Sequence, residues 1–518
     1  MLEVISLLNS CRIKKIKNLF FILFVFGFSN SQGQNFIISD ISRSDNSNIR
    51  FEILGKFKGN VLIYKNISRE HFLTKYDDSM RLIESVPMDF LPDKIFNMDF
   101  INYPGHFFLV YQFQVKNIVY CNAVKINVEG AKIGEPKVLD TTNVGFFADN
   151  KIYTTTYSED KKRILIYKRN IKNDEIAVAA RVFDENLQLT DSTRQVFPYD
   201  SRSETYSDLA IDNRGNYVYA KETNSKRGSG ITTIDFFVHR SGVDSFLTQR
   251  VALEKKFTEG LFIKADNLNK KFVLNSFCYM NRKKRLDGLF TVMLDTDSFT
   301  QIKTAYNIFS DSLRSKSNTS YQYSFDYENL NIKNVIMKKN GGFIILSEDA
   351  YSETIGNNNM WNRGFFNNMP MGGFSDYYLY NPYMYYGYRP FNNFGLNQTV
   401  RYYSNDIVVA NIDSSLNLVW NSLIRKKQMD VDNDNFISFS TFNSAGEIKF
   451  FFIERERTRQ VISNHGLFPD GEIRRYATLK SPESRYDFMP RLAKQIGSAQ
   501  MIIPFVYLGK IGFAKIEL

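Results

Sequence analysis

The sequence predicts an all-β fold arranged as a β-propeller, from the spacing of its turn signals and from its strand-forming composition. Seven short polar corners have first residues that lie 51, 56, 56, 55, 118 and 56 positions apart. A nearly constant period is typical of repeat proteins, in which each unit buries its apolar face against its neighbours. The corners are Asp77-Asp78-Ser79, Val128-Glu129-Gly130, Asp184-Glu185-Asn186, Arg240-Ser241-Gly242, Asp295-Thr296-Asp297, Asp413-Ser414-Ser415 and Pro469-Asp470-Gly471.

The composition of the 518-residue chain favours strands over helices. It is 43% hydrophobic and 15% aromatic, with 46 Phe and 30 Tyr but only 12 Pro. Aromatic and β-branched residues are enriched in strands, and no long stretch has a sustained helical apolar period. The chain can therefore bury a large core and lacks the low hydrophobicity of a disordered protein.

A second set of turns alternates with the first, and an apolar run follows each turn. These turns are Pro104-Gly105, Asp149-Asn150, Arg214-Gly215, Asn269-Lys270, Gly341-Gly342, Ala445-Gly446 and Gly497-Ser498. The runs after them are 107–113, 152–157, 217–220, 272–277, 343–346, 448–453 and 501–507. Nearly continuous apolar character is expected of strands covered on both faces, so we expect these runs to be the inner strands of propeller blades.

Two sets of seven corners predict seven blades, and six or eight blades also fit the spacing. The corner at Asp77 has no earlier partner in the second set, and the corner at Gly497 has no later partner in the first. We therefore expect strands from both termini to share the last blade, with residues 511–518 as one of them. Such sharing closes the ring and removes exposed sheet edges. An array of β-sandwiches is the main alternative fold, but it leaves the regular spacing unexplained.

The first 31 residues have the pattern of a signal peptide. Arg12-Ile13-Lys14-Lys15-Ile16-Lys17 precedes an apolar run at 19–28, and Ser29-Asn30-Ser31 supplies small residues for cleavage. The apolar run is too short to span a bilayer as a helix, and a short membrane anchor is the alternative. We expect an exported protein, periplasmic, on the cell surface or extracellular. Residues 32–518 would form the propeller, with no transmembrane segment in the mature chain.

The formal charge of the whole chain is +11, from 66 Lys and Arg against 55 Asp and Glu. The basic residues are spread along the chain rather than gathered in one block, which is typical of a solvated surface. Attraction of anionic glycans or lipid headgroups is the alternative role of such a charge. We expect no nucleic-acid partner, because this chain has no recognisable nucleic-acid-binding motif.

Residues 352–403 interrupt the pattern with an insertion rich in aromatic residues, Asn and Gly, which we expect to project from the fifth repeat. Long loops in compact domains are usually functional or disordered. Three interpretations remain open: a low-complexity loop without a specific ligand, a docking loop for a protein, and a platform for sugars. Met369, Met371 and Met384 add adaptable apolar surface, which favours a protein over a sugar. The candidate binding residues are Trp361, Phe365, Phe366, Tyr377, Tyr378, Tyr380, Tyr383, Tyr385, Tyr386 and Tyr388.

The sequence carries no catalytic signature, so we assign no catalytic residue and expect no cofactor. Zinc-protease, hydrolase-elbow and zinc-ribbon motifs are absent from it. Cys121 and Cys278 lie in strand-like runs, where we expect them to be buried as small apolar residues; a disulfide between them is the alternative. The four His residues are far apart in sequence: His71, His106, His239 and His465.

Asp430, Asp432 and Asp434 alternate as the oxygen ligands of a calcium loop do. The rest of that motif is missing, because position six is Asn435 rather than Gly and position twelve is Thr441 rather than Glu. An exposed turn explains the three carboxylates as well. They are a weak calcium candidate, and we predict no metal site.

The segment Asp413-Ser414-Ser415-Leu416-Asn417-Leu418-Val419-Trp420 resembles the Asp-turn-Trp edge of several propeller families. In quinoprotein-like and sialidase-like blades the motif repeats with a Gly near the turn, whereas here it occurs once and lacks the Gly. The resemblance supports a blade corner and brings no cofactor or glycosidase activity with it. As a whole, the leader, the Asn-, Lys-, Phe- and Tyr-rich strands and the lack of catalytic motifs resemble uncharacterised exported bacterial β-propeller proteins.

We therefore expect a non-catalytic binding or scaffolding protein of the cell envelope. Its propeller loops and aromatic-rich insertion would engage an envelope protein or a glycan. The alternative is a secreted propeller enzyme that binds or hydrolyses glycans. Two carboxyl groups facing each other at the mouth of the channel, close to exposed rings, would favour the enzyme.

Overall fold

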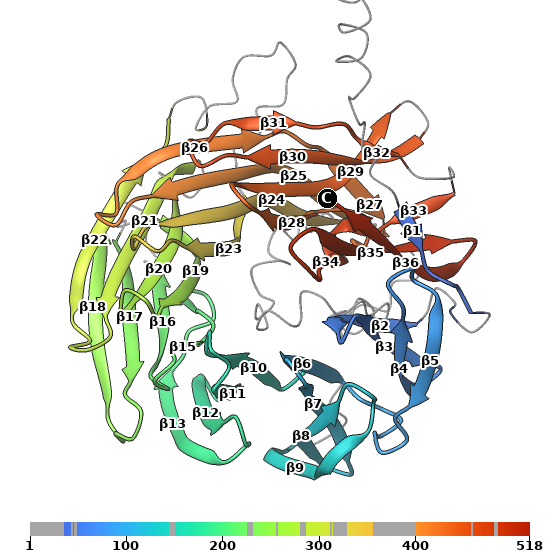
Figure 1. Ribbon diagram of the computed structural model, residues 1–518. Coiled ribbons are helices and arrows are strands. Elements are labelled where there is room, and N and C mark those ends of the chain that lie inside the picture. The colour runs from blue at the N-terminus through green and yellow to red at the C-terminus, as the bar shows by residue number, and fades with distance from the viewer. Residues whose placement is uncertain are drawn as a thin grey trace, which may run out of the picture.

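Eight antiparallel sheets of four or five strands stand around a central axis in the computed structural model (Figure 1). The structure describes residues 36–42, 45, 49–144, 151–224, 231–254, 257–279, 286–310, 313, 329–355, 399–431, 433–456, 459–480 and 485–518. In seven of the sheets the strand order follows the chain from the axis outward, and in the eighth the N-terminal strand β1 (Phe36–Ile38) is added at the outer edge. The architecture is thus the predicted β-propeller.

The blades are numbered in chain order. Blade 1 contains β2 (Arg50–Phe57), β3 (Asn60–Ile67), β4 (Glu70–Tyr76) and β5 (Leu82–Pro87). Blade 2 contains β6 (Asn97–Tyr103), β7 (His106–Val115), β8 (Ile118–Asn127) and β9 (Lys132–Asn143). Blade 3 contains β10 (Tyr153–Tyr157), β11 (Arg163–Lys172), β12 (Glu175–Asp184) and β13 (Leu189–Pro198). Blade 4 contains β14 (Glu204–Tyr206), β15 (Ala210–Ile211), β16 (Tyr217–Asn224), β17 (Ile231–His239) and β18 (Phe246–Glu254).

The second half of the ring repeats this plan. Blade 5 contains β19 (Phe257–Asp266), β20 (Lys271–Tyr279), β21 (Leu286–Asp295) and β22 (Gln301–Ile308). Blade 6 contains β23 (Leu330–Met337), β24 (Phe343–Ile355), β25 (Thr399–Ile412), β26 (Leu418–Ile424) and β27 (Gln428–Val431). Blade 7 contains β28 (Phe439–Ser444), β29 (Glu447–Glu456), β30 (Arg459–Leu467), β31 (Ile473–Arg475) and β32 (Leu479–Lys480). Blade 8 contains β33 (Tyr486–Phe488), the short 3-10 helix η1 (Pro490–Leu492), β34 (Lys494–Gln495), β35 (Gln500–Tyr507), β36 (Lys510–Glu517) and, from the other end of the chain, β1 (Phe36–Ile38).

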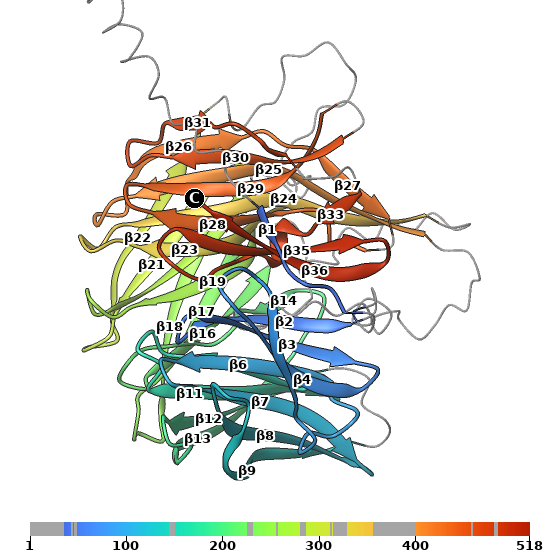
Figure 2. The same cartoon turned by 45° about the vertical axis from the view of Figure 1, so that its right-hand side comes forward.

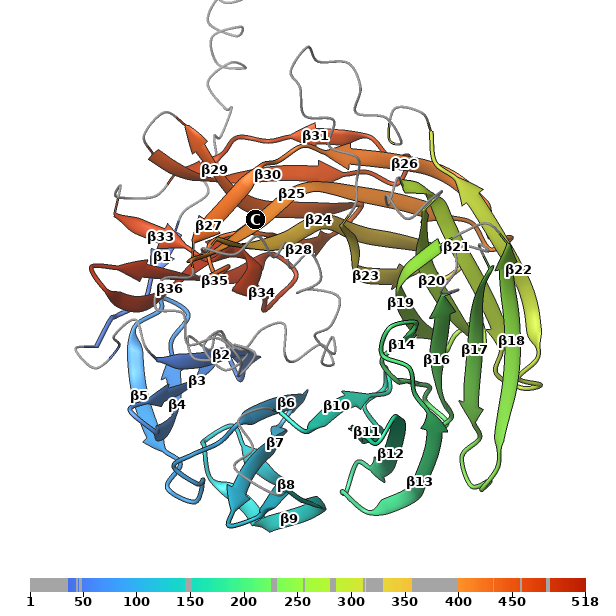
Figure 3. The ribbon, with the colours of Figure 1, turned by 180° about the vertical axis from the view of Figure 1, so that it is seen from behind.

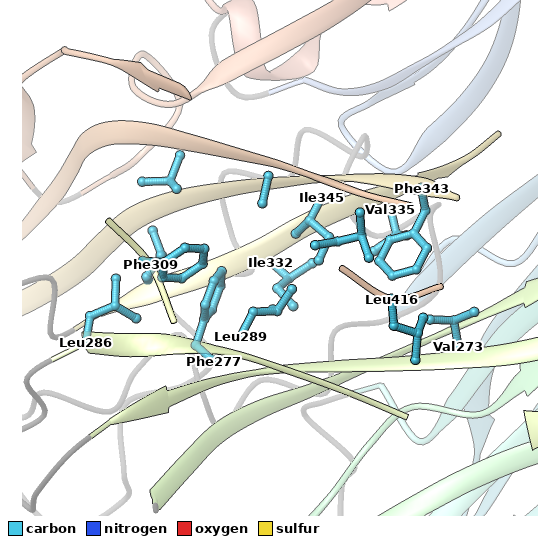
Figure 4. Packing of buried hydrophobic residues seen from close by; sticks show 14 of the residues in the cluster. Val273, Phe277, Leu286, Leu289, Phe309, Ile332, Val335, Phe343, Ile345 and Leu416 are labelled. Atoms are coloured by element: carbon cyan, nitrogen blue, oxygen red, sulfur yellow. The ribbon is translucent and has the colours of Figure 1, made fainter. Parts of the chain in front are cut away.

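The core lies between the blades, because strands covered by a neighbour on each side bury both of their faces. Successive strand residues point to opposite faces, so on β7 Phe107 and Leu109 pack against blade 1 while Phe108 and Val110 pack against blade 3. Among the described residues, eight such apolar clusters occupy the eight interfaces of the ring. Figure 4 shows the cluster between blades 5 and 6, and Figure 2 shows neighbouring sheets facing one another from the side.

Strands from both ends of the chain close the ring, as the sequence predicted. The N-terminal strand β1 is the outer strand of blade 8 and pairs antiparallel with β36, with Phe36 opposite Ile516 and Ile38 opposite Ala514. A cluster that includes Phe51 of blade 1 and Phe513 of blade 8 fills the last interface; the two rings meet edge to face at 5.1 Å. The blades therefore form a continuous ring in both views from its ends (Figure 1 and Figure 3).

The ring has eight blades, which was an alternative to the predicted seven, because the first set of corners lacks blade 8 and the second set missed the turns between the first and second strands of blades 1 and 3. The seven corners of the first set are the turns between third and fourth strands of blades 1 to 7. Blade 8 has no such turn, because its fourth strand comes from the N-terminus. The turn between β2 and β3 at Lys58-Gly59 was missed in the second set, so the corner at Asp77 was assigned to the shared blade.

The predicted inner strands are mostly second strands. Six of the seven apolar runs fall on β7, β16, β20, β24, β29 and β35, and the seventh falls on the first strand β10. Burial on both faces was correct for them: every residue of β20 is buried. The strands that do line the axis carry more polar residues, because one of their edges faces the channel rather than another strand. An apolar pattern therefore identifies the second strand better than the first.

The aromatic-rich insertion lies between β24 and β25 of blade 6 rather than in the fifth repeat. Residues 352–355 and 399–403 belong to these strands, which pair as far as Ile355 opposite Thr399. Residues 356–398 lie outside the described part of the chain. Within the part that is described, no helix has the length and apolar character needed to cross a membrane.

Candidate functional site

The candidate binding residues of the insertion lie outside the described residues. They are Trp361, Phe365, Phe366, Tyr377, Tyr378, Tyr380, Tyr383, Tyr385, Tyr386 and Tyr388. Their part in binding stays a prediction. Near the base of the insertion, the rings of Tyr351 on β24 and Tyr403 on β25 stack with centroids 4.7 Å apart. Among the described residues, the candidate site lies in the centre of the ring.

A channel of about 1100 Å³ runs along the axis and is lined from six of the eight blades. Its wall is formed by the end of β10, by β14 and β15, by β19, by β23, by β28 and by residues 491–495 around β34. All of these elements are the first strands of blades 3 to 8 or directly follow them. Small antiparallel strands joined by tight turns thus bring residues from 156 to 495 around one space.

The turns between first and second strands hold one another at one end of the channel, which we call the turn face. Asn213 of blade 4 donates its backbone N–H to Asn267 Oδ1 of blade 5 at 2.8 Å, and Asn267 Nδ2 donates to Glu159 Oε2 of blade 3 at 2.9 Å. Asp160 N donates to Asn213 Oδ1 at 3.1 Å. Two further links are Lys271 Nζ to Gly341 O at 2.7 Å, between blades 5 and 6, and Asn443 N to Gln495 Oε1 at 3.0 Å, between blades 7 and 8.

Basic side chains outnumber acidic ones in the described channel wall. Six basic residues line it, against three acidic residues, which gives an excess of three positive charges. The basic residues are Lys264 on β19, Lys333 on β23, Lys338 and Lys339 in the turn after β23, Arg491 in η1 and Lys494 on β34. The acidic residues are Glu159, Asp208 and Asp266.

Each acidic residue of the wall already accepts hydrogen bonds from neighbouring side chains. Burial raises the pKa of Asp208, and the charge on Arg169 lowers it in part. The bonds are Asn267 Nδ2 to Glu159 Oε2 at 2.9 Å, Tyr167 OH to Asp208 Oδ1 at 2.8 Å, and Asn269 Nδ2 to Asp266 Oδ2 at 2.9 Å. These carboxylates are held in place by the fold, and no two of them belong to the same blade.

A buried ion pair supports the wall behind β23. Glu348 is 0% exposed and lies 2.7 Å from Lys426 Nζ and 3.4 Å from Lys333 Nζ. Ser404 and Ser438 donate their hydroxyls to its two oxygens at 2.5 and 2.7 Å. Burial alone would raise the pKa of Glu348, but the charges on Lys426 and Lys333 outweigh it and hold the pKa at about 2. Glu348 thus contacts two ammonium groups, and Asp406 adds a second negative charge near Lys426.

Two carboxylates, Glu52 and Asp99, lie close to the channel wall where the ring closes. Glu52 of β2 is 4% exposed and accepts a bond from Lys494 Nζ of β34 at 3.2 Å, so this ion pair joins blade 1 to blade 8. Burial raises the pKa of Glu52 to about 6, the charge on Lys494 lowers it, and the charge on Asp99 raises it further. Burial also raises the pKa of Tyr157, with smaller contributions from Glu52 and Asp99. Of these four residues, Tyr157 and Lys494 line the channel.

Two hydroxyl groups of lining residues have no hydrogen-bond partner within the described structure. They are Ser440 Oγ on β28 and Tyr206 OH on β14, and both oxygens are buried. Buried polar groups are usually paired with protein or ordered solvent.

The calcium candidate is only partly described. Asp432 lies outside the described residues. Asp434 accepts a hydrogen bond from Arg491 Nη1, and Asp430 Oδ1 accepts the backbone N–H of Val431 at 2.8 Å. Burial raises the pKa of Asp430 to about 6. Within the described residues, no group of three His, Cys, Asp or Glu side chains is placed to hold a metal ion.

The His and Cys residues lie away from the described channel wall. Cys121 and Cys278 are buried, as expected, and no disulfide joins them. His239 Nε2 and Asp191 Oδ2 lie 2.7 Å apart, and burial lowers the pKa of His465 to about 4. His71 and His106 lie on β4 and β7 of blades 1 and 2.

Sequence reasoning missed the channel wall, which gathers residues from six separate first strands. The charge of the chain gave a hint in the right direction, but single lysines in short polar strands carry no motif. A detectable signal was present in the turns, because Asn213 and Asn267 both lie in corners between first and second strands, and Asn443 lies near the end of the first strand β28.

No protein-family model and no curated protein matches the sequence. Several solved structures share the general arrangement at very low identity. Prolyl oligopeptidase B from Galerina marginata is 7% identical with a TM-score of 0.39, over 90% of this chain and 56% of that one. An ulvan lyase of polysaccharide lyase family 25 is 9% identical with a TM-score of 0.35, over 81% of this chain and 91% of that one.

A further match is the β-propeller domain of the trilobed protease from Pyrococcus furiosus. It is 9% identical with a TM-score of 0.33, over 82% of this chain and 96% of that one. The present chain thus spans little more than half the length of the prolyl oligopeptidase and nearly the whole of the propeller domain. At these scores the likenesses carry no functional argument.

Proposed function

We propose that the protein is a non-catalytic binding protein whose ligand occupies the central channel. The observation that carries the proposal is the space of about 1100 Å³ enclosed by first strands of six blades. Ligand pockets usually have volumes of roughly 300–1,000 Å³, so this channel has room for a small molecule or a short oligomer. Export, proposed from residues 1–31, would place this binder in the cell envelope or outside the cell.

The fixed geometry of the wall supports binding rather than catalysis. A direct hydrogen bond at 2.9 Å joins the side chains of Glu159 in blade 3 and Asn267 in blade 5. A wall that is ordered before the ligand arrives loses little conformational entropy on binding. The acidic side chains of the wall accept hydrogen bonds from Asn and Tyr neighbours, whereas a glycan hydrolase needs one carboxyl group to donate a proton and a second to attack or activate water.

Blocking the channel tests the proposal. Thr205 lines the channel on β14, the first strand of blade 4, and its side chain is exposed. Thr248 is also exposed, but it lies on the outer strand β18 of the same blade. We expect Thr205→Trp to weaken ligand binding at least about 10-fold by occupying the space, while Thr248→Trp leaves it unchanged.

The measurement is a glycan array of neutral and acidic oligosaccharides, followed by calorimetric titration of the ligands that bind. Thermal melting of both variants checks that the ring is intact. Equal affinity of the Thr205→Trp variant would place the ligand outside the channel. Mass spectrometry of the recovered ligand tests the second half of the proposal, because a cleaved or modified ligand would show an enzyme.

A protein partner at the insertion is a second part of the proposal. The many aromatic and Met residues of 356–398 support it. Tyr, Trp and Met side chains supply large, adaptable contact area at interfaces. Deletion of residues 356–397 tests this part of the proposal.

A further inference from the structure

We propose that the channel binds an acidic oligosaccharide, whose carboxylate or sulfate groups meet the lysines of β19 and β23. This inference rests on the proposed function, because it names the ligand class of the same channel. The lysines are Lys264, Lys333, Lys338 and Lys339, which we call the lysine wall. Lys264 lies on β19 of blade 5, Lys333 lies on β23 of blade 6, and Lys338 and Lys339 lie in the turn after β23. The strands β19 and β23 are neighbours.

The lysine wall keeps a positive charge in spite of its neighbours. Lys338 Nζ donates to Asn411 Oδ1 at 2.6 Å, and an amide oxygen leaves the ammonium charge uncompensated. Lys338 and Lys339 form no ion pair with any of the described carboxylates. Lys333 Nζ lies 3.4 Å from Glu348, which also pairs with Lys426 at 2.7 Å. Opposite charges attract more strongly in a partly enclosed space than in open solvent, so the channel favours an anion.

The remaining side chains of the wall fit a sugar better than a nucleic acid. Five of the six basic lining residues are Lys, whose ammonium group binds an anion as a point charge. Amides and hydroxyls that can bond sugar hydroxyls lie between them: Asn331, Asn334, Ser440, Thr441, Asn443 and Gln495. Single-stranded nucleic acid is instead held by rows of stacked aromatic rings.

The unpaired hydroxyl of Ser440 gives an independent indication of a polar ligand. Ser440 is 8% exposed, and its Oγ has no hydrogen-bond partner within the described residues. A buried hydroxyl without a partner costs free energy unless a bound molecule or water supplies one. Ser440 and Thr441 stand on β28, the first strand of blade 7, next to the blade that carries Lys333.

The experiment compares defined probes on the full chain by calorimetric titration. The probes are a hexamer of galacturonate, a sulfated chondroitin hexasaccharide, maltohexaose as the neutral control, inorganic polyphosphate and a six-nucleotide oligo-dT. We expect one or both acidic oligosaccharides to bind at least about 10-fold more tightly than maltohexaose, and more weakly as the salt concentration rises. The carboxylated and the sulfated probe distinguish the two sources of negative charge.

Two matched double variants locate the charge. Lys338→Gln with Lys339→Gln removes two charges from the channel. Lys116→Gln with Lys172→Gln removes two charges from exposed ends of hairpins in blades 2 and 3. The first pair should weaken binding of the acidic probe about 5- to 30-fold, and the second should leave it within about 2-fold, because exposed charges beyond a Debye length are screened.

The outcomes separate this inference from the proposed function. Equal affinity of the two double variants would overturn the lysine wall, and so would tighter binding of polyphosphate or oligo-dT than of both acidic sugars. Binding of maltohexaose alone, lost in Thr205→Trp, would overturn the inference and leave the channel as a binding site. Binding that survives Thr205→Trp would overturn both. Thermal melting of each variant confirms that its ring is folded.

Discussion

Glu52 lies at the interface between blades 1 and 8, where the ring closes, so its protonation affects an ion pair across that interface. It belongs to blade 1, and its partner Lys494 belongs to blade 8. The buried carboxylate has lost most of its hydration, which is why its pKa rises to about 6 although an ammonium group is 3.2 Å away. At neutral pH the fold therefore holds a charge that would be more stable in water.

The first prediction concerns the pH dependence of stability. A carboxyl group whose pKa is raised in the folded state stabilises that state below its unfolded pKa, near 4.5, and loses this contribution as the pH rises through about 6. The shift corresponds to about 2 kcal/mol. We expect urea denaturation of Glu52→Gln to show a weaker gain in stability than the parent between pH 7.5 and 4.5.

The comparison isolates Glu52 because every other titrating group is common to both proteins. Glu129→Gln is the matched control, since Glu129 pairs with Lys58 at the surface and both side chains are more than half exposed. Its stability should follow the parent at each pH. Parallel curves for the parent and Glu52→Gln would contradict the assigned pKa.

Residues of this kind were beyond the reach of the sequence. The burial of Cys121 and Cys278 was predicted correctly, because an apolar run around a small residue is a local signal. The pairs Glu52 with Lys494 and Glu348 with Lys426 join strands of different blades or distant strands of one blade. Nothing near Glu52 in the chain distinguishes it from a surface carboxylate.

At the scale of elements, the single Trp of the Asp-turn-Trp segment has a definite structural role. Trp420 on β26 of blade 6 donates its indole N–H to Pro469 O in the corner of blade 7 at 3.1 Å. Ser422 Oγ donates to Gly471 O of the same corner at 2.6 Å. The outer strand of one blade thus fastens the turn of the next. The segment is therefore a blade corner, as the resemblance implied. The sequence did not show that its Trp contacts the corner of the next blade.

The second prediction uses the close approach of this corner to the ring. Gly471 has φ +91°, and a Cβ placed there would lie 2.7 Å from Trp420 Cδ2. We expect Gly471→Ala to lower the free energy of unfolding by about 2–4 kcal/mol, from backbone strain and from the clash together. Gly446 has φ +92° with open space around it, so Gly446→Ala should cost only the strain, about 1–2 kcal/mol.

Denaturation of the two variants under the same conditions measures the difference. The fluorescence of Trp420 provides a second observable, since its surroundings should change in Gly471→Ala and stay constant in Gly446→Ala. Equal destabilisation by the two substitutions would show that the indole ring yields without cost.

The elements themselves were largely predictable, because tight turns and paired apolar runs are local. Corners with Asp, Ser or Gly marked seven of the eight blades. Blade 8 was not marked, because its fourth strand comes from the N-terminus, and the turn of blade 1 at Lys58-Gly59, where a lone Gly with φ +87° follows Lys58 with φ +47°, was missed in the second set. Six of the seven runs predicted to be inner strands are second strands. Burial on both faces depends on the neighbouring blades, and only the closed ring defines those neighbours.

At the scale of the whole molecule, the third prediction separates the insertion from the ring. β24 and β25 pair continuously up to Ile355 opposite Thr399, so a short turn can replace what lies between them. We expect deletion of residues 356–397 to leave the melting temperature within a few degrees of the parent and to abolish association with an envelope protein partner. Pull-down from a membrane and periplasmic extract, with the full chain as bait in parallel, measures the second effect.

A deletion variant that does not fold would show that the insertion is part of the core. A folded variant that still retains the same partner would place the docking surface on the ring. Channel binding by this variant should match that of the full chain, because the described wall contains no residue of the insertion.

The pairing of β1 with β36 has a consequence for how the molecule is made. Residues 36–38 are among the first of the described chain to be synthesised, yet their partners at 514–516 are among the last. Seven blades can acquire their hydrogen bonds in order as the polypeptide emerges, but the oldest strand has to wait, unpaired, for the youngest one. The ring can therefore close only after β36 has been synthesised.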